Sequence, residues 1–214
     1  MTTRRDLLAL AAAAGLAPAL ASPALAAAPA ALSPADQALV DKAVAYLSGL
    51  KTAKGRFVQT DGRNVSTQGT IYLQRPGKAR FEYDAPSGLT VVSDGSYVYV
   101  SDSRLKTFDG YPLKSTPLAL FLAREIRLDR GVRVVRVARL ADGFSITAAD
   151  VRKETRGEIT LSFSESPMRL IGWTITDARG AATRLRLTEL TPAGAFPPAT
   201  FALKDPRPRR GGRP

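Results

Sequence analysis

The segment Gly69-Thr70-Ile71-Tyr72-Leu73-Gln74-Arg75-Pro76-Gly77-Lys78-Ala79-Arg80-Phe81-Glu82-Tyr83 decides the fold of this chain. It holds two runs rich in β-branched and aromatic residues, near 67–75 and 78–84, linked by the turn signal Arg75-Pro76-Gly77. Two such runs on either side of a short turn predict a pair of antiparallel strands.

Nine further runs of the same kind surround this hairpin. Turn signals link many of them, at Asp61-Gly62, Asp94-Gly95, Asp109-Gly110, Asp142-Gly143 and Arg179-Gly180. Consecutive hairpins predict an antiparallel meander of about ten strands. The strands are expected near 54–60, 89–94, 96–101, 104–109, 132–140, 143–149, 157–164, 168–177 and 182–190.

The predicted sheet has one apolar face. Ile159, Leu161 and Phe163 alternate with Thr and Ser, and Ile171 and Trp173 share a face in the next run. A sheet that is apolar on one side needs a cover, and so many strands are expected to curl around that cover.

Two short helices are available as the cover. Ser33 and Pro34 are typical of a helix start, apolar residues follow at helical spacing, and Gly49 can end that helix. A second helix is expected after Ser115-Thr116-Pro117, over 118–123 and on to Ile126 and Leu128. Two small helices over a curved sheet leave two alternatives, an apolar cavity for lipid or acyl chains and a fully packed core. The apolar face of the first helix comprises Leu39, Val40, Ala43, Val44 and Leu47.

The chain contains no histidine and no cysteine, which excludes disulfides, thiolate metal sites and His-dependent catalytic triads. Catalysis would have to rest on carboxylates, Lys, Ser or Tyr. A carboxylate hydrolase stays an alternative, but each acidic pair lies where a strand, turn or loop ordinarily carries charge. We therefore expect a binding protein without a cofactor rather than an enzyme. The acidic pairs are Glu82/Asp84, Asp102/Asp109 and Glu154/Glu158.

Residues 1–26 have the pattern of a secretory signal peptide. Arg4 and Arg5 precede an alanine-rich apolar stretch that ends at Ala24-Leu25-Ala26, a small-residue cleavage site. An ordinary secretory signal and a twin-arginine signal both fit, and either predicts export to the bacterial periplasm. Cleavage lowers the formal charge from +12 to +11. Without a cysteine for lipid attachment or a later membrane-spanning stretch, we expect a protein free in the periplasm.

The basic charge gathers in two segments. Arginines recur at positions 124, 127, 130, 133, 136 and 139, and residues 205–214 form a Pro/Gly-rich basic tail that we expect to be disordered. These charges are interpreted either as a solvated surface or as a docking face for anionic headgroups or an acidic partner. Export and the lack of a recognisable module disfavour nucleic-acid binding. The tail's docking candidates are Arg207, Arg209, Arg210 and Arg213.

An ordered set of motifs resembles the periplasmic outer-membrane lipoprotein carrier family (LolA-like). The set is Gly55-Arg56-Phe57-Val58-Gln59-Thr60, the segment 69–83, Pro86, Val91-Val92-Ser93-Asp94-Gly95, Val98-Tyr99-Val100 and Thr116-Pro117-Leu118. The resemblance implies a mainly β fold with few helices, an unclosed antiparallel β-barrel of about eleven strands whose helical lid encloses an apolar cavity. It places a single carrier domain over 27–204.

The resemblance also implies a task without bond chemistry. Such proteins accept lipoproteins from an ABC-type release complex in the inner membrane, shield their acyl chains, and deliver them to an outer-membrane receptor or to the outer membrane directly. We expect a monomer. The alternative is a sensor, or a carrier of another lipid or amphiphile, on the same fold.

The resemblance assigns roles by position. Arg75 matches the arginine that holds the lid closed and lets it open when lipid enters. Phe81 and Tyr83 match cavity-lining aromatic positions, and Ala79 shares their face, where the family often has Phe, so the cavity mouth is expected to be wider here. The remaining core or lining residues are Phe57, Tyr72, Val92 and Trp173, and the lid residues are Leu118, Leu120, Phe121 and Leu122.

Overall fold

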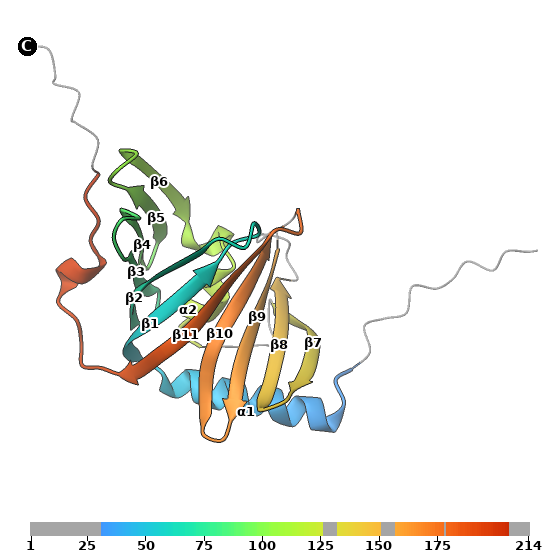
Figure 1. The fold of residues 1–214 in the computed structure, drawn as a ribbon. Coiled ribbons are helices and arrows are strands. Elements are labelled where there is room, and N and C mark those ends of the chain that lie inside the picture. The colour runs from blue at the N-terminus through green and yellow to red at the C-terminus, as the bar shows by residue number, and fades with distance from the viewer. Residues whose placement is uncertain (1–30, 126–131, 151–156, 178, 206–214) are drawn as a thin grey trace, which may run out of the picture. The chain divides into compact units, whose positions relative to one another are not determined.

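The first and last strands of the chain pair at the centre of one antiparallel sheet (Figure 1). The computed structural model describes residues 31–125, 132–150, 157–177 and 179–205. Eleven strands lie in the order β6-β5-β4-β3-β2-β1-β11-β10-β9-β8-β7. Their bounds are β1 Thr52–Thr60, β2 Ser66–Gln74, β3 Lys78–Tyr83, β4 Leu89–Asp94, β5 Tyr97–Asp102, β6 Thr107–Pro112, β7 Val132–Leu140, β8 Gly143–Asp150, β9 Gly157–Glu165, β10 Met168–Asp177 and β11 Ala182–Pro192.

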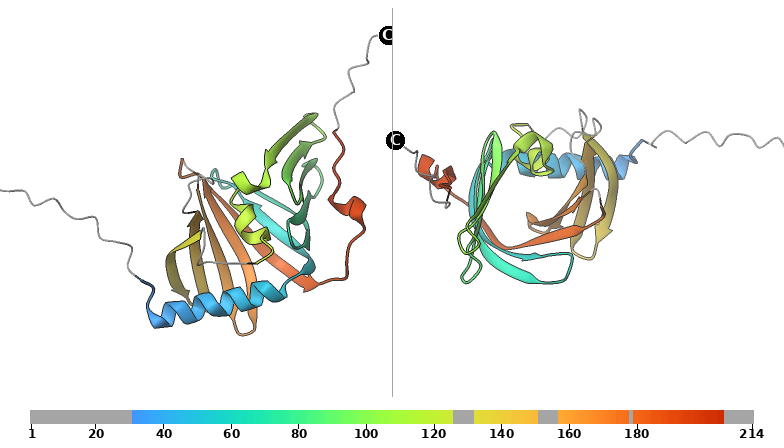
Figure 2. Two further views of the ribbon diagram at one scale, coloured as in Figure 1. Left: turned by 180° about the vertical axis from the view of Figure 1, so that it is seen from behind. Right: turned by 90° about the horizontal axis from the view of Figure 1, so that it is seen from above.

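The sheet is therefore two meanders, β1–β6 and β7–β11, joined by the β1–β11 pair. This corrects the single meander expected from the hairpin signals. The two edges, β6 and β7, are consecutive in sequence, and the lid segment lies between them in the chain. The strands curl without closing, and the helices α1 and α2 lie across the open side (Figure 2). The prediction of an unclosed antiparallel barrel with a helical cover is confirmed.

Helix α1 (Pro34–Gly49) has the predicted bounds. The hydroxyl of Ser33 accepts a hydrogen bond from the backbone N–H of Asp36, which satisfies one free donor of the first turn. The predicted apolar face is buried at four of its five positions, and Val44 is half-buried against the core. Among the described helices none is both long and apolar enough to cross a membrane.

Strand β6 and its turn differ from the prediction. The expected strand 104–109 is shifted to Thr107–Pro112, so that Asp109-Gly110 lies inside the strand instead of in a turn. The turn before the strand covers residues 103–106, where the Asp102 carboxylate accepts hydrogen bonds from the backbone N–H groups of Arg104 and Leu105, at 2.8 and 3.0 Å. Side chains of this type stabilise turns by such local bonds.

The second helix is shorter than predicted and is capped differently. Helix α2 is Leu118–Leu122, preceded by the 3₁₀ helix η1 (Leu113–Ser115). Pro117 occupies the N-cap position and gives no side-chain cap, while the Thr116 hydroxyl donates to the Leu113 carbonyl at 2.8 Å. The predicted continuation through Ile126 and Leu128 lies outside the described residues.

A segment after β11 covers part of the outer face of the sheet, and the sequence did not predict it. It includes the 3₁₀ helix η2 (Pro198–Phe201). The ring of Phe196 packs edge-on to Tyr72 at 5.5 Å, and Arg80 donates to the Thr200 carbonyl at 3.3 Å. Phe201 is buried. The outer face of β2–β4 is therefore partly apolar and packed against the chain's own end.

Tyr72 and Val92 lie on this outer face, so their prediction as cavity-lining residues is wrong. Successive residues of a strand point to opposite faces, and the neighbours of Tyr72, Ile71 and Leu73, are the ones buried in the main core. Tyr72 and Val92 both register with Arg80, which reaches the C-terminal segment. Val92 is fully buried, but on the opposite side of the sheet from the core.

Candidate functional site

Aromatic side chains form a continuous row on the inner face of the sheet. The ring centroid of Phe57 lies 5.8 Å from that of Phe81 and 5.2 Å from that of Tyr83, and Phe81 lies 6.1 Å from Trp173. These pairs have the edge-to-face geometry that aromatic quadrupoles favour. Gly69 makes room for the row, because a Cβ there would lie 2.8 Å from the Phe57 ring. Four residues that were predicted to be core or cavity-lining residues, and that are far apart in the sequence, thus lie together.

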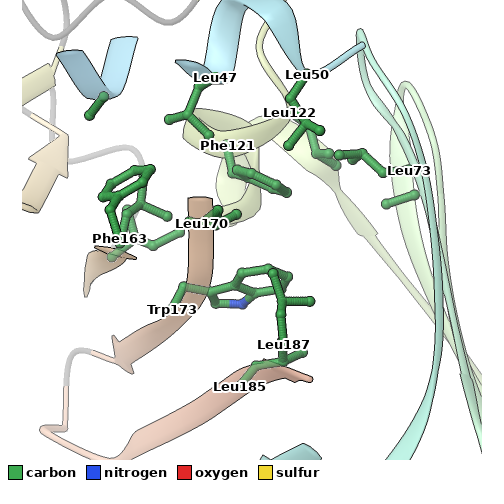
Figure 3. Close-up of a cluster of buried hydrophobic side chains, with 14 of the residues drawn as sticks. Leu47, Leu50, Leu73, Phe121, Leu122, Phe163, Leu170, Trp173, Leu185 and Leu187 are labelled. Atoms are coloured by element: carbon green, nitrogen blue, oxygen red, sulfur yellow. The ribbon is translucent and has the colours of Figure 1, made fainter. Parts of the chain in front are cut away.

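The lid closes over this row. Phe121 of α2 packs on Trp173 with ring centroids 5.2 Å apart, and both Phe121 and Leu122 are only 1% exposed. Figure 3 shows Leu47 and Leu50, from the end of α1, beside them and facing the β10 and β11 side chains. The other two predicted lid residues, Leu118 and Leu120, are half-buried against the same core.

The guanidinium of Arg75 joins the two helices to the rim of the sheet. It donates hydrogen bonds to the carbonyl oxygens of Leu47 and Leu50 at the end of α1, the second at 3.5 Å. Its other terminal nitrogen donates to the carbonyl of Ala123, just after α2, at 2.7 Å. One planar side chain therefore contacts both helix ends through the fixed fork of its guanidinium donors.

The electrostatics of Arg75 are those of a buried cation held by carbonyl dipoles. The C-terminal carbonyls of a helix carry partial negative charge, which compensates the guanidinium in part. Burial lowers the pKa of Arg75 from its ordinary value, but arginine stays charged in proteins. Its Nε is buried and has no hydrogen-bond partner among the described residues. The closed arrangement is thus held by hydrogen bonds, but one buried donor of Arg75 stays unsatisfied.

The turn after Arg75 forms a second link to the lid. The backbone N–H of Gly77 donates to the carbonyl of Leu122 at 2.8 Å. Gly77 has φ +78°, and a Cβ there would lie 2.7 Å from Cα of Gly95, so both its conformation and its packing require glycine. A pocket of about 510 Å³ lies beside α2, between this turn and residues such as Leu113 and Ala119.

Ala79 lies at this end of the inner face. It is fully buried and registers with Leu73 on one side and Ser93 on the other. The hydroxyl of Ser93 donates to the carbonyl of Gly77 at 2.6 Å. The expectation of a wider mouth, drawn from alanine at position 79, stays a prediction.

One polar pair interrupts the apolar inner face. The Tyr83 hydroxyl donates to Oε1 of Gln59 at 2.6 Å. Burial raises the pKa of Tyr83 to about 12, and the hydrogen bond to Gln59 opposes this only in part. Tyr83 is therefore neutral at physiological pH and supplies aromatic surface with one satisfied hydroxyl.

Three of the acidic residues considered for catalysis have structural contacts. Glu82 pairs with Arg80 at 2.7 Å, and Asp84 pairs with Arg56, which lowers the pKa of that carboxyl. Asp102 organises the β5–β6 turn. No three acidic side chains within the described ranges gather closely enough to hold a metal ion. Glu154 and the tail arginines Arg207, Arg209, Arg210 and Arg213 lie outside the described residues.

The sequence did not predict all the residues that lie beneath the lid. Leu185 and Leu187 are buried opposite the lid; their alternation with Arg184 and Arg186 indicates an apolar strand face but not the helix that covers it. The carbonyl acceptors of Arg75 have no sequence signal, because every residue carries a carbonyl.

Fold and site together define an unclosed β-barrel protein whose apolar interior is sealed by a short helix. The model of the outer membrane lipoprotein carrier protein LolA family matches residues 48–204, and the chain belongs to that family.

Two curated relatives named outer-membrane lipoprotein carrier protein show the same relationship along most of the chain. The one from Chromobacterium violaceum is 29% identical over 171 residues, covering 76% of this chain and 82% of the relative. The one from Dechloromonas aromatica is 29% identical over 178 residues, covering 78% and 84%. A solved LolA superfamily protein from Nitrosomonas europaea superimposes with a TM-score of 0.45 at 10% identity, over 78% of this chain and 97% of that one.

The buried phenol of Tyr83 gives a pH prediction. Because its folded pKa lies near 12 and an unfolded tyrosine titrates near 10, the stability that Tyr83 contributes is complete below pH 10. That contribution is lost as the pH rises toward 12, by at most about 2 kcal/mol. Tyr83→Phe is therefore expected to be less stable than wild type at neutral pH and to close that gap at high pH, as measured by urea unfolding.

The control is Tyr111→Phe, because Tyr111 is 51% exposed. Its difference from wild type is expected to stay constant across the same pH range. A constant difference for Tyr83→Phe as well would contradict the assigned burial.

Proposed function

We propose that this protein is a periplasmic carrier that shields the acyl chains of lipoproteins released from the inner membrane and delivers them to the outer membrane. The observation that carries the proposal is the lidded aromatic row, in a chain of the lipoprotein carrier family. Each CH₂ withdrawn from water is worth about 0.8 kcal/mol, so acyl chains cannot cross an aqueous space unshielded. An apolar interior with a movable cover meets that need without bond chemistry.

Helix α2 is the part that moves. Helix α1 is fixed by four buried side chains, and Glu165 at the end of β9 pairs with Lys42 of α1 and Arg139 of β7, each at 3.1 Å. Helix α2 has only five residues, and two backbone carbonyls at its end, of Leu122 and Ala123, accept the bonds from Gly77 and Arg75. The adjoining pocket leaves α2 space to shift.

Cargo replaces Phe121 against the sheet. When α2 moves, the face of Trp173 is uncovered, and acyl chains extend from it along Phe81 and Phe57 toward Tyr83. Contacts of this kind are non-directional, so different acyl chains can fill the same space.

Arg75 makes the binding reversible. Entry of cargo breaks its hydrogen bonds to the helix ends, and the free energy regained on closing favours release. A hydrogen bond to a charged group contributes about 1.5–3 kcal/mol, so even one of them biases the equilibrium at least about tenfold. The unpartnered Nε limits how firmly the lid is held, which keeps entry accessible.

The remaining parts of the proposal concern location and partners. Residues 1–26 direct export and are removed, and the domain 27–204 accepts cargo from an ABC-type release complex. It passes that cargo to a receptor in the outer membrane or to the membrane directly. The family relationship supports a periplasmic, non-enzymatic role.

Release of new lipoprotein from spheroplasts tests the function. The purified mature protein is expected to bring newly made lipoprotein into the supernatant, because it covers the acyl chains as they leave the membrane. Release no greater than with an unrelated periplasmic protein would contradict the carrier role. A carrier of another amphiphile on the same fold would also fail this assay.

The role of Arg75 is tested by Arg75→Leu. The variant is expected to accept lipoprotein but to pass it on at least about tenfold more slowly, because closing no longer regains the lost hydrogen bonds. Transfer is measured from the loaded protein to outer-membrane vesicles. Arg63→Leu is the control, since Arg63 is exposed and pairs with its near neighbour Asp61 at 3.5 Å, far from the lid in the sequence. Normal onward transfer by Arg75→Leu would remove the proposed role.

A further inference from the structure

The outer faces of the two meanders differ in how their charges are balanced. On β1–β3, Arg56 pairs with Asp84 and Arg80 with Glu82. On β7–β11, five exposed arginines point outward, and within the described part of the chain none of them forms an ion pair. We call them the convex arginine face: Arg133, Arg136, Arg169, Arg184 and Arg186.

The sheet register defines the layout of this face. Arg136 of β7 and Arg184 of β11 end one row across the sheet. Four strand spacings separate them, about 19 Å. The three residues between them are Thr147, Thr160 and Thr174, and the neighbouring row runs from Arg186 through Gly172, Ser162 and Ser145 to Ala138. Arginines thus flank small and hydroxyl-bearing residues, of which Ser145 and Thr147 are buried.

The face carries a large excess of positive charge. Glu158 of β9 lies in the next row, between Arg133 of β7 and Ala182 of β11, and Glu189 follows Arg186 on the outer side of β11. The face therefore carries a positive potential, which attracts an anionic surface. The chain's formal charge of +12 has the same sign.

The character of the surface favours a lipid partner over a protein or a nucleic acid. A stable protein interface needs a desolvated centre of large side chains, and a single-stranded nucleic acid needs aromatic rings for stacking. Apart from Ile171, which is 39% exposed at the β10 bulge, the residues at the centre of this face are Thr, Ser, Gly and Ala, so the centre has no aromatic ring and only one large apolar side chain. Anionic headgroups are mobile and can move to widely spaced cations on a convex surface. Each basic residue near them then contributes to the free energy of membrane binding.

We propose that the convex arginine face binds the headgroups of an anionic phospholipid bilayer. The carrier then rests on the membrane through the outside of β7–β11, on the opposite side of the sheet from the interior that α2 covers. This surface binding is independent of cargo and goes beyond the proposed carrier function.

Binding to vesicles of phosphatidylglycerol mixed with phosphatidylcholine tests the proposal. The wild-type chain, with its tail intact, is expected to bind these vesicles at low salt and not pure phosphatidylcholine. Arg184→Gln/Arg186→Gln is expected to weaken the partition coefficient about 25-fold, about fivefold for each arginine. Lys106→Gln/Lys204→Gln removes the same charge elsewhere and is expected to change it less than about threefold.

Three outcomes would overturn the proposal: no binding by wild type, no loss in the arginine variant, or an equal loss in both variants. Capture of acidic polypeptide without any binding to vesicles would also overturn it and assign the face to a protein partner. Arg184→Lys/Arg186→Lys keeps the charge and is expected to bind like wild type, which separates loss of charge from loss of folding.

A labelling measurement locates the surface without removing an arginine. Because the chain has no cysteine, Thr174→Cys places a single fluorophore within the face and Leu105→Cys places one on the β5–β6 turn. Anionic vesicles are expected to shield the first label from an aqueous quencher and leave the second accessible. The reverse pattern would contradict the proposed orientation.

Discussion

The closed structure depends on one cation held by backbone carbonyls. Arg75 stands at the end of a strand and bonds to the last residues of α1 and to the residue after α2, so three elements meet at one side chain. A carboxylate partner would give a tighter and more permanent link. In the proposed carrier cycle, hydrogen bonds to carbonyls form a weaker link that breaks when acyl chains offer a larger gain in free energy.

The topology explains why the opening and the lid coincide. The two strands at the ends of the sequence, β1 and β11, pair at the centre of the sheet, so its free edges are the strands on either side of the lid segment. Strand alternation then sorts the side chains. The inner face holds the aromatic row, and the outer face holds the C-terminal cover over β2–β4 and the convex arginine face on β7–β11.

Much of this could be predicted from sequence because it is local. The hydrophobic periodicity and cap of α1, most strand bounds, and the inner-face placement of Phe57, Phe81 and Trp173 follow from spacing and turn residues. The motif order around Arg75 indicated the family. The predictions failed where the surroundings of a side chain depend on a segment far away in the sequence. Tyr72 and Val92 have the size and apolarity of core residues, but they pack beneath a segment more than a hundred residues later in the chain.

Fluorescence of Trp173 measures whether acyl chains enter the space beneath the lid. It is the single tryptophan of the chain, is 5% exposed, and lies against Phe121 in the closed state. A diacylated lipopeptide with brominated acyl chains is expected to quench it strongly on binding, because bromine quenches only at close range, whereas the unacylated peptide leaves it unchanged. Full binding of the brominated lipopeptide, seen by co-elution, with unaltered Trp173 fluorescence would contradict the account.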